Sequence, residues 1–288
     1  MGSPILQVQD LSVEYTLERG IILAVDRVSF EVGRGEFIGI VGESACGKST
    51  LLFAIAQLLA PPAVLTGGDV IFKGRSMVGL TDSDLAAIRW QDLSVVMQSA
   101  MNALNPVKSI GAQFRDVLRA HGMTSRDQIA GRSAQVLQMV GIDPVHLKSY
   151  PHQLSGGMRQ RSMIAMAMLF TPDLVIMDEP TSALDVVAQR SLMVQVKELQ
   201  QQFGFAVIFV THDMSLVSHF SDHLMVMYAG QIAESGPVED VLGRPRHPYT
   251  QLLVSAVPDP RAELGVGADT DRGEPPRVID PTPGCRFR

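Results

Sequence analysis

The 288-residue sequence contains few cysteines and only one tryptophan, and its 30 acidic residues outnumber its 24 basic ones. The two cysteines, Cys46 and Cys285, cannot build a disulfide framework, which suits a reducing cytoplasm. A formal net charge of −6 argues against nucleic acid as a partner, because chains that bind phosphate backbones are more often basic. We therefore expect a globular protein of the cytoplasm that does not act on nucleic acid.

Long apolar runs are also missing. The longest run extends from Met163 to Phe170, well short of the ~20 residues that a membrane-spanning helix needs. The segment Met1–Tyr15 alternates apolar and polar residues and lacks the basic start and apolar block of a signal peptide. We expect that the chain does not enter a membrane by itself, although it could dock on one through a partner.

The chain is long enough for one large domain or two small ones, and 46% hydrophobic residues allow a sizeable core. Strand-like segments alternate with helical patterns, which predicts a parallel sheet with helices on its faces. Helices are expected at Lys48–Leu59, stopped by Pro61 and Pro62, and over most of residues 98–170. The expected strands are Leu6–Val13, Leu23–Val32, Phe37–Val41, Val70–Phe72, Leu174–Met177, Ala206–Val210, Leu224–Tyr228 and Gln231–Glu234.

A glycine-rich segment follows the third of these strands with the spacing G-x-x-x-x-G-K-[ST]. Small residues let backbone N–H groups approach phosphates, and the N-terminus of the following helix attracts the same anion. Lys48 is expected to neutralise the β- and γ-phosphates, and Ser49 to ligate Mg²⁺. The alternative is a glycine-rich turn before a core helix, which the strand-and-helix context argues against. The candidate binding residues are Gly42, Glu43, Ser44, Ala45, Cys46, Gly47, Lys48, Ser49 and Thr50.

Acidic residues and a histidine follow two later strands. Asp178 and Glu179 come directly after Leu174–Met177, where adjacent acids are costly unless paired or metal-bound. Asp178 is expected to share Mg²⁺ with Ser49, and Glu179 to act as the general base; the alternative is an acidic turn. His212 follows Ala206–Val210, so it is expected at the same sheet edge, where ligands of open α/β sheets bind.

The segment Leu154-Ser155-Gly156-Gly157-Met158-Arg159-Gln160 resembles the signature sequence of ABC-transporter ATPases, and the resemblance covers about residues 5–255. It implies that Gln98 is the Q-loop glutamine, which reaches the Mg²⁺ and the attacking water. It further implies that Ser182-Ala-Leu-Asp185 is the D-loop, that His212 is the switch histidine, and that Tyr15 stacks on adenine. Ser155 is a good N-cap. In this family Ser155, Gly156 and Gly157 would face the γ-phosphate held by a second subunit of a head-to-tail dimer.

The resemblance implies an α/β fold: a P-loop NTPase core with a mostly parallel sheet, an antiparallel β subdomain and an α-helical signature subdomain at about 98–170. We assign residues 1–235 to the ATPase domain and 236–288 to a C-terminal extension. Nine of the 17 prolines lie beyond Gly236, so regular structure is expected to thin out there.

Three further segments are similar to those of ATPases that power dipeptide, oligopeptide and nickel importers. They are Met97–Pro106, His247-Pro-Tyr249-Thr250 and Gly284-Cys285. The implied protein binds ATP and Mg²⁺ on the cytoplasmic face of the cell membrane. Its implied partners are two transmembrane permease subunits, a second ATPase subunit, more often a paralogue than a copy, and indirectly an extracytoplasmic substrate-binding protein. Nickel or oligosaccharide cargo, a non-transport ABC ATPase and a non-hydrolysing partner remain alternatives.

Two departures from the family pattern lie in the glycine-rich segment. Ala45 stands where glycine is common, which is tolerable if its φ is negative. Cys46 stands where serine is common, so alkylation of this thiol is expected to block ATP turnover and bound ATP to protect it. Relatives also carry further tail cysteines, some with an iron–sulfur cluster. Because Cys285 stands alone in the tail, we expect no four-cysteine cluster within this chain.

Overall fold

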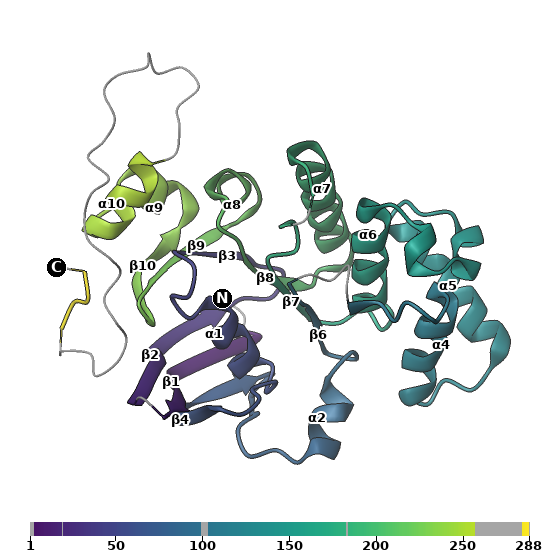
Figure 1. The fold of residues 1–288 in the computed structure, drawn as a ribbon, viewed down its shortest axis with the longest axis horizontal. Coiled ribbons are helices and arrows are strands. Elements are labelled where there is room, and N and C mark those ends of the chain that lie inside the picture. Colours follow the sequence, from purple (N-terminus) through teal and green to yellow (C-terminus); the bar gives the residue numbers. More distant parts are fainter. Residues whose placement is uncertain (1–2, 19, 99–102, 183, 257–283, 288) are drawn as a thin grey trace. The chain divides into compact units, whose positions relative to one another are not determined.

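The computed structural model describes residues 3–18, 20–98, 103–182, 184–256 and 284–287. The chain forms two compact units, and each is taken by itself below. The first comprises Met1–Ile5, Gly33–Glu36 and Gly79–Phe209, and the second comprises Leu6–Val32, Phe37–Val78 and Val210–Arg288. Figure 1 traces the elements in chain order. Over the described ranges, no helix combines the length and the apolar character required to cross a membrane.

The second unit begins with an antiparallel sheet of strand order β2-β1-β4-β5. Its strands are β1 (Leu6–Leu17), β2 (Gly20–Val32), β4 (Ala63–Phe72) and β5 (Arg75–Ser76). The sequence prediction placed β1, β2 and β4 correctly but made them too short, and it missed β5. Backbone pairing continues past the end of the apolar alternation, to the Leu17–Gly20 pair of a hairpin, and bulges interrupt the two-residue period that predicts strands.

A second group of strands in this unit leads to the glycine-rich segment. The strand order is β10-β9-β3, where β3 is Phe37–Val41, β9 is His223–Tyr228 and β10 is Gln231–Pro237. Strand β3 runs parallel to β9, whereas β10 is antiparallel to β9. Every residue of β3 is buried, which explains its unbroken apolar sequence. The predicted bounds of β3 are confirmed.

Helix α1 (Lys48–Ile55) begins where predicted, but its predicted end at Leu59 is wrong. Gln57 takes the left-handed conformation, with φ of 54°. The N–H of Leu58 donates to the carbonyl of Phe53 at 2.7 Å, and that of Gln57 to the carbonyl of Ala54 at 3.1 Å. This pair of bonds is a Schellman motif, which closes a helix. The helix therefore ends before the two prolines expected to stop it.

Three helices complete the second unit: α8 (Met214–Phe220), α9 (Val238–Gly243) and α10 (Pro248–Ser255). The expectation that regular structure thins out beyond Gly236 is wrong for residues 238–255, because proline at the first position of a helix starts it without losing a hydrogen bond. Pro248 occupies that position in α10. High proline content here marks helix starts as well as loops.

The first unit holds three strands in the order β8-β7-β6, namely β6 (Leu93–Val96), β7 (Leu174–Asp178) and β8 (Ala206–Val210), with β6 and β7 parallel. The stretch predicted as mostly helical is confirmed where the structure describes it, and α4, α5 and α6 lie side by side in Figure 1. The helices of that stretch are α4 (Ile110–Ala120), α5 (Arg126–Met139), the 3₁₀ turns Pro144–Lys148 and Pro151–Gln153, and α6 (Gly156–Ala167). The first unit also contains α2 (Asp82–Ile88) and α7 (Val186–Phe203). The α/β class is confirmed.

The glycine-rich loop between β3 and α1 contains a backbone conformation that differs from the sequence prediction. Ala45 has φ of 63°, so the expectation of a negative φ is wrong. The left-handed conformation costs an L-residue with a Cβ roughly 1–2 kcal/mol, and glycine avoids this cost. The backbone at Ala45 is therefore strained.

We predict that Ala45→Gly leaves the thermal denaturation midpoint unchanged or raises it, because relief of the left-handed strain offsets the ~0.5–1 kcal/mol of extra chain entropy. Ala54→Gly is the matched control, since Ala54 lies inside α1, where glycine costs ~1 kcal/mol. Equal destabilisation by both substitutions, in differential scanning calorimetry, would contradict a strained Ala45.

Candidate nucleotide-binding site

The loop Gly42–Gly47 joins β3 to α1 within the second unit, and its two end glycines are required by close packing. A Cβ on Gly42 would collide with the carbonyl oxygen of Met227, and a Cβ on Gly47 with the carbonyl oxygen of Ala24. Both glycines also have positive φ, 154° and 107°. The backbone is therefore pressed against neighbouring strands, which leaves its small residues free to approach an anion.

Lys48 is the first residue of α1 and is only 6% exposed. Its ammonium folds back over the loop and donates to the carbonyl oxygens of Gly42 at 2.8 Å and Glu43 at 2.6 Å. Buried charges need such partners, because removing an ion from water is costly. The loop thus holds a cation beside a helix N-terminus, an arrangement suited to phosphate groups.

Cys46 lies inside the same loop, with its sulfur 3.7 Å from Lys48 Nζ. Burial raises the pKa of this thiol above its ordinary value, although the nearby ammonium of Lys48 opposes the shift. The thiol is therefore mostly protonated at neutral pH and a slow nucleophile. Cys285, by contrast, is exposed.

Tyr15, on β1, contacts the beginning of α1. Its hydroxyl lies 3.0 Å from Oγ1 of Thr50, with either group as donor. This bond fixes the half-buried tyrosine beside the helix that follows the phosphate loop. Tyr15 and Thr50, both candidate binding residues, are brought together by the fold.

His212 follows β8 and belongs to the second unit. The N–H of Thr211 donates to the carbonyl of Ile40 at 3.2 Å, and Ile40 lies on the strand that leads into the loop. Asp213 then caps α8 by accepting from the N–H of Ser215 at 2.8 Å. The histidine is therefore carried on a well-anchored turn.

In the first unit, Asp178 ends β7 and is 1% exposed. Glu179 follows with φ of 43°, a conformation that costs energy and that often marks functional sites. Its carboxylate accepts a hydrogen bond of 2.7 Å from Nε2 of Gln98. The structure thus joins two residues that were assigned to the reaction on separate sequence grounds.

The signature segment also lies in the first unit. Ser155 caps α6 as expected, accepting from the N–H of Met158 at 3.3 Å. The helix runs from Gly156 to Ala167, so the two glycines that follow Ser155 lie in its first turn.

The beginning of α6 lines a small pocket together with Leu184 of the D-loop and the first turns of α7. Asp185 caps α7, accepting from the N–H of Ala188 at 2.9 Å. Ala183 of the D-loop lies outside the described residues, as do positions 99–102 of the segment after Gln98. The pocket, of about 250 Å³, is lined by Ser155, Gly157, Met158, Arg161, Leu184, Ala188 and Leu192.

Sequence reasoning missed one contact of the phosphate loop. The N–H of Glu43 donates to the hydroxyl of Tyr249 at 3.0 Å, across 206 positions of sequence. The segment His247-Pro-Tyr249-Thr250 was noticed only as a subfamily feature. The available signal was a tyrosine at the second position of a helix that begins with proline, because tyrosine hydroxyls usually find a hydrogen-bond partner when they are buried.

Comparison with known proteins agrees with this arrangement. Residues 25–182 match the family described as ABC transporter, and residues 233–288 match the oligopeptide/dipeptide transporter, C-terminal region. Residues 147–218 also match an AAA domain described as a putative AbiEii toxin of a type IV toxin–antitoxin system.

Relatives match over nearly the whole chain. A dipeptide transport ATP-binding protein of Bacillus subtilis is 42% identical, covering 98% of this chain and 85% of the relative. A probable peptide ABC transporter ATP-binding protein of Sinorhizobium fredii is 40% identical, with the same coverage.

Solved structures share the fold. A dimeric ATP-binding cassette in a post-hydrolysis state, bound to ADP and Pi, has a TM-score of 0.73 at 28% identity and covers 81% of this chain and 98% of its own. The structure of cbiO1 from Clostridium perfringens, described as part of the ABC transporter complex cbiONQ, has a TM-score of 0.72 at 26% identity and covers 84% of this chain and 92% of its own. The chain therefore belongs to the ABC transporter family and is one of its ATPase subunits.

Proposed function

We propose that this chain binds and hydrolyses ATP to power an ABC importer of peptides. The observation that carries the nucleotide part is the buried Lys48 ammonium, held over a loop of glycine-bounded backbone at the start of a helix. The cargo is supported by the match of residues 233–288 to the oligopeptide/dipeptide transporter C-terminal region, and by relatives described as peptide and dipeptide transport ATP-binding proteins.

The phosphate loop would bind ATP through its backbone N–H groups and through Lys48, which moves from carbonyl oxygens to the β- and γ-phosphates. We assign adenine stacking to Tyr15, whose hydroxyl is already held by Thr50. Ser49, Asp178 and Gln98 are the groups that would hold Mg²⁺. When bound, Mg²⁺ would neutralise phosphate charge.

We assign the role of general base to Glu179. A carboxylate in this role must reach a water and keep the right orientation. The hydrogen bond from Gln98 orients the carboxylate. The φ of 43° at Glu179 is a strained backbone conformation of the kind that clusters at functional sites. His212 would hold the γ-phosphate and the attacking water in place.

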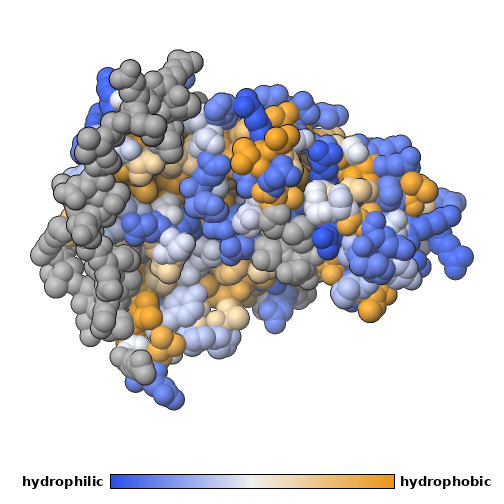
Figure 2. Space-filling view, turned by 45° about the horizontal axis from the view of Figure 1, so that its top comes forward, coloured by the Kyte–Doolittle hydropathy of each residue, from blue (hydrophilic) through white to orange (hydrophobic). Residues whose placement is uncertain are grey.

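A second ATPase subunit would complete the site through Ser155, Gly156 and Gly157. Support for a protein contact comes from Val186 and Val187, which are 78% and 80% exposed at the start of α7, next to the D-loop. Hydrophobic residues elsewhere on the surface are scattered among hydrophilic ones on the face shown in Figure 2. Two adjacent exposed valines favour burial by a partner.

We propose that the cytoplasmic helices of two membrane permease subunits dock on the helical part of the first unit, near residues 98–114. A groove of about 660 Å³ opens there between α4 and α5. Arg115, Arg119, Arg126 and Lys148 line it. This cationic character suits an acidic segment of the permease. Docking there would hold the chain on the cytoplasmic face of the membrane.

The assignment of the importer is tested by isolating the chain from native membranes and identifying every chain that co-purifies. We expect two integral membrane subunits and a second ATPase subunit, a paralogue rather than a copy, and peptide uptake that stops when the gene is deleted. Co-purification with nucleic acid, or intact peptide uptake with lost uptake of nickel or oligosaccharide, would contradict the peptide assignment.

Glu179→Gln is expected to bind ATP with near-normal affinity but to lose most hydrolysis, because an amide cannot accept the proton of the water. The trapped ATP is expected to favour the closed dimer. Steady-state phosphate release and sedimentation velocity with ATP measure the two effects. Glu198→Gln changes an exposed carboxylate of α7, outside the assigned site, and is the control. Normal turnover of the Glu179 variant would remove this residue from the role of base.

The docking groove is tested by reversing its charge. Arg115→Glu with Arg119→Glu is expected to reduce co-purification with the permease at least tenfold, because the opposite charge repels an acidic segment. Arg75→Glu makes the same kind of charge change on β5, outside the groove. Unchanged membrane recovery of the double variant, or equal loss in the control, would contradict docking at this groove.

Cys46 reports on occupancy of the loop. In a Cys285→Ser background, maleimide is expected to modify Cys46 slowly at neutral pH and faster as the pH rises, because the raised pKa keeps the thiolate scarce. ATP is expected to slow the reaction further, and complete modification to abolish turnover. Intact mass and ATPase assays follow both. Full turnover after complete Cys46 modification would contradict its place beside the phosphates.

A further inference from the structure

We propose that the C-terminal extension is part of the nucleotide-binding site, and that Tyr249 is a positioning residue for ATP binding. The extension and the phosphate loop lie in the same unit, and two separate links join them. Tyr249 bonds directly to Glu43 at the beginning of the loop, and Arg286 holds the turn whose Gly230 bonds to Cys46 at its end. This inference rests on the proposed role of the loop in ATP binding and goes beyond it.

The first contact is the hydrogen bond between Glu43 N–H and the Tyr249 hydroxyl, 3.0 Å long. Tyr249 is 0% exposed, so the bond is shielded from water. The carbonyl of the same residue, Glu43, accepts from Lys48 at 2.6 Å. Tyr249 therefore holds the backbone of the residue whose carbonyl anchors the lysine that would bind phosphate.

The hydroxyl supplies a partner that the loop itself does not. A buried backbone N–H without an acceptor costs about as much as a lost hydrogen bond, so the loop without Tyr249 would turn this N–H elsewhere or open to water. Burial also raises the pKa of Tyr249, mainly by removing the phenolate from solvent. The hydroxyl therefore stays protonated across the physiological range and keeps both donor and acceptor capacity.

The second contact runs through Arg286. This side chain donates to the carbonyl of Ala229 and to the Asp26 carboxylate at 2.7 Å; the guanidinium is 6% exposed and the carboxylate 11%. Gly230, next to Ala229, donates its N–H to the carbonyl of Cys46 at 2.9 Å and accepts from the N–H of Asp26 at 2.9 Å. Arg286 thus grips the turn that holds the end of the phosphate loop.

Aromatic packing places the tail against the tyrosine. The ring of Phe287 lies 5.6 Å from that of Tyr249 and 5.4 Å from that of Tyr228, and the two tyrosine rings are 4.4 Å apart. Centroid distances of this size are those of stabilising aromatic pairs. Phe287 and Arg286 are adjacent, so one short segment of the tail supports both Tyr249 and the turn at Ala229.

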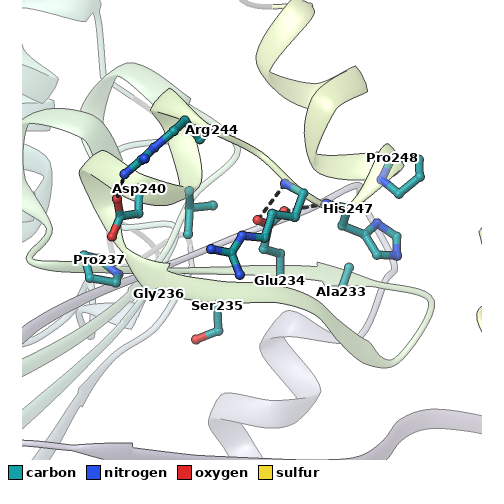
Figure 3. Close-up of a pocket in the computed structure, with 11 residues that line it drawn as sticks. Ala233, Glu234, Ser235, Gly236, Pro237, Asp240, Arg244, His247 and Pro248 are labelled. Carbon is teal, nitrogen blue, oxygen red and sulfur yellow. Dashed lines mark hydrogen bonds and ion pairs between the residues drawn. The ribbon is translucent and has the colours of Figure 1, made fainter.

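The start of α10 is fixed on β10, which sets the position of Tyr249. The Glu234 carboxylate accepts from the backbone N–H groups of Arg246 at 2.9 Å and His247 at 3.0 Å, drawn as the dashed lines at Glu234 in Figure 3. Burial opposes ionisation of Glu234, but these N–H groups outweigh it and lower its pKa. Nδ1 of His247 then accepts from the N–H of Tyr249 at 3.1 Å. These contacts within the C-terminal extension orient Tyr249, so that its hydroxyl reaches the loop.

The test compares Tyr249→Phe with Tyr228→Phe in the full chain. Both remove one hydroxyl from the same aromatic cluster, but only the first removes the acceptor of Glu43 N–H. We expect Tyr249→Phe to weaken binding of a fluorescent ATP analogue about tenfold and to raise KM more than it lowers kcat, as loss of one buried hydrogen bond predicts. Tyr228→Phe is expected to bind within twofold of wild type.

Each result decides the matter. Equal affinity of Tyr249→Phe and wild type, or equal losses in the two variants, would overturn the positioning role. A wild-type chain that does not bind the analogue would instead overturn the proposed function, so the two failures are distinguishable. If Tyr249→Phe does not fold, Arg286→Gln is measured in its place. An Arg286→Gln chain with normal circular dichroism and wild-type affinity would equally contradict the inference.

Discussion

The burial of one cation organises this site. Lys48 is almost inaccessible to water, and its ammonium is held by the carbonyl oxygens of Gly42 and Glu43. Such a charge requires a loop whose carbonyls converge on it, and that loop requires glycine where neighbouring strands press on its ends. This backbone is kept in place by the entirely buried strand β3 before it, by helix α1 after it, and by contacts with the C-terminal extension. A bound phosphate group would offer Lys48 negatively charged oxygens in place of the neutral carbonyl oxygens. The ammonium prefers the charged oxygens, and this preference makes the loop a nucleotide site.

The supports of the loop come from parts of the chain that lie far apart in sequence. Tyr249 and Arg286 belong to residues 236–288, which match a region named for oligopeptide and dipeptide transporters. A C-terminal region that bonds to the start of the loop, and that holds the turn bonded to its end, can influence nucleotide affinity. The extension is therefore held to the ATPase domain by hydrogen bonds as well as by the covalent chain. Loss of its last described residues is expected to disturb the conformation of the loop.

Much of this was accessible from the sequence where local pattern determines structure. The bounds of β3 and β8, the start of α1 and the cap at Ser155 were predicted correctly, because buried runs and capping residues act over a few positions. The errors have the opposite cause. A Schellman motif ended α1 earlier than predicted, and the backbone pairing of the strands continued beyond the residues that alternate between apolar and polar. The positive φ of Ala45 and the bond from Glu43 to Tyr249 depend on neighbours distant in the chain, which no local pattern reveals.

The central claim is tested most directly by a crystal structure of the full chain trapped with ATP, in the Glu179→Gln background. The account predicts that Lys48 Nζ lies within hydrogen-bond distance of the phosphates, having left the Gly42 and Glu43 carbonyls, while Tyr249 still accepts from Glu43 N–H. A structure with the triphosphate bound and Lys48 still on those two carbonyls, or with the tyrosine displaced from the loop, would contradict it.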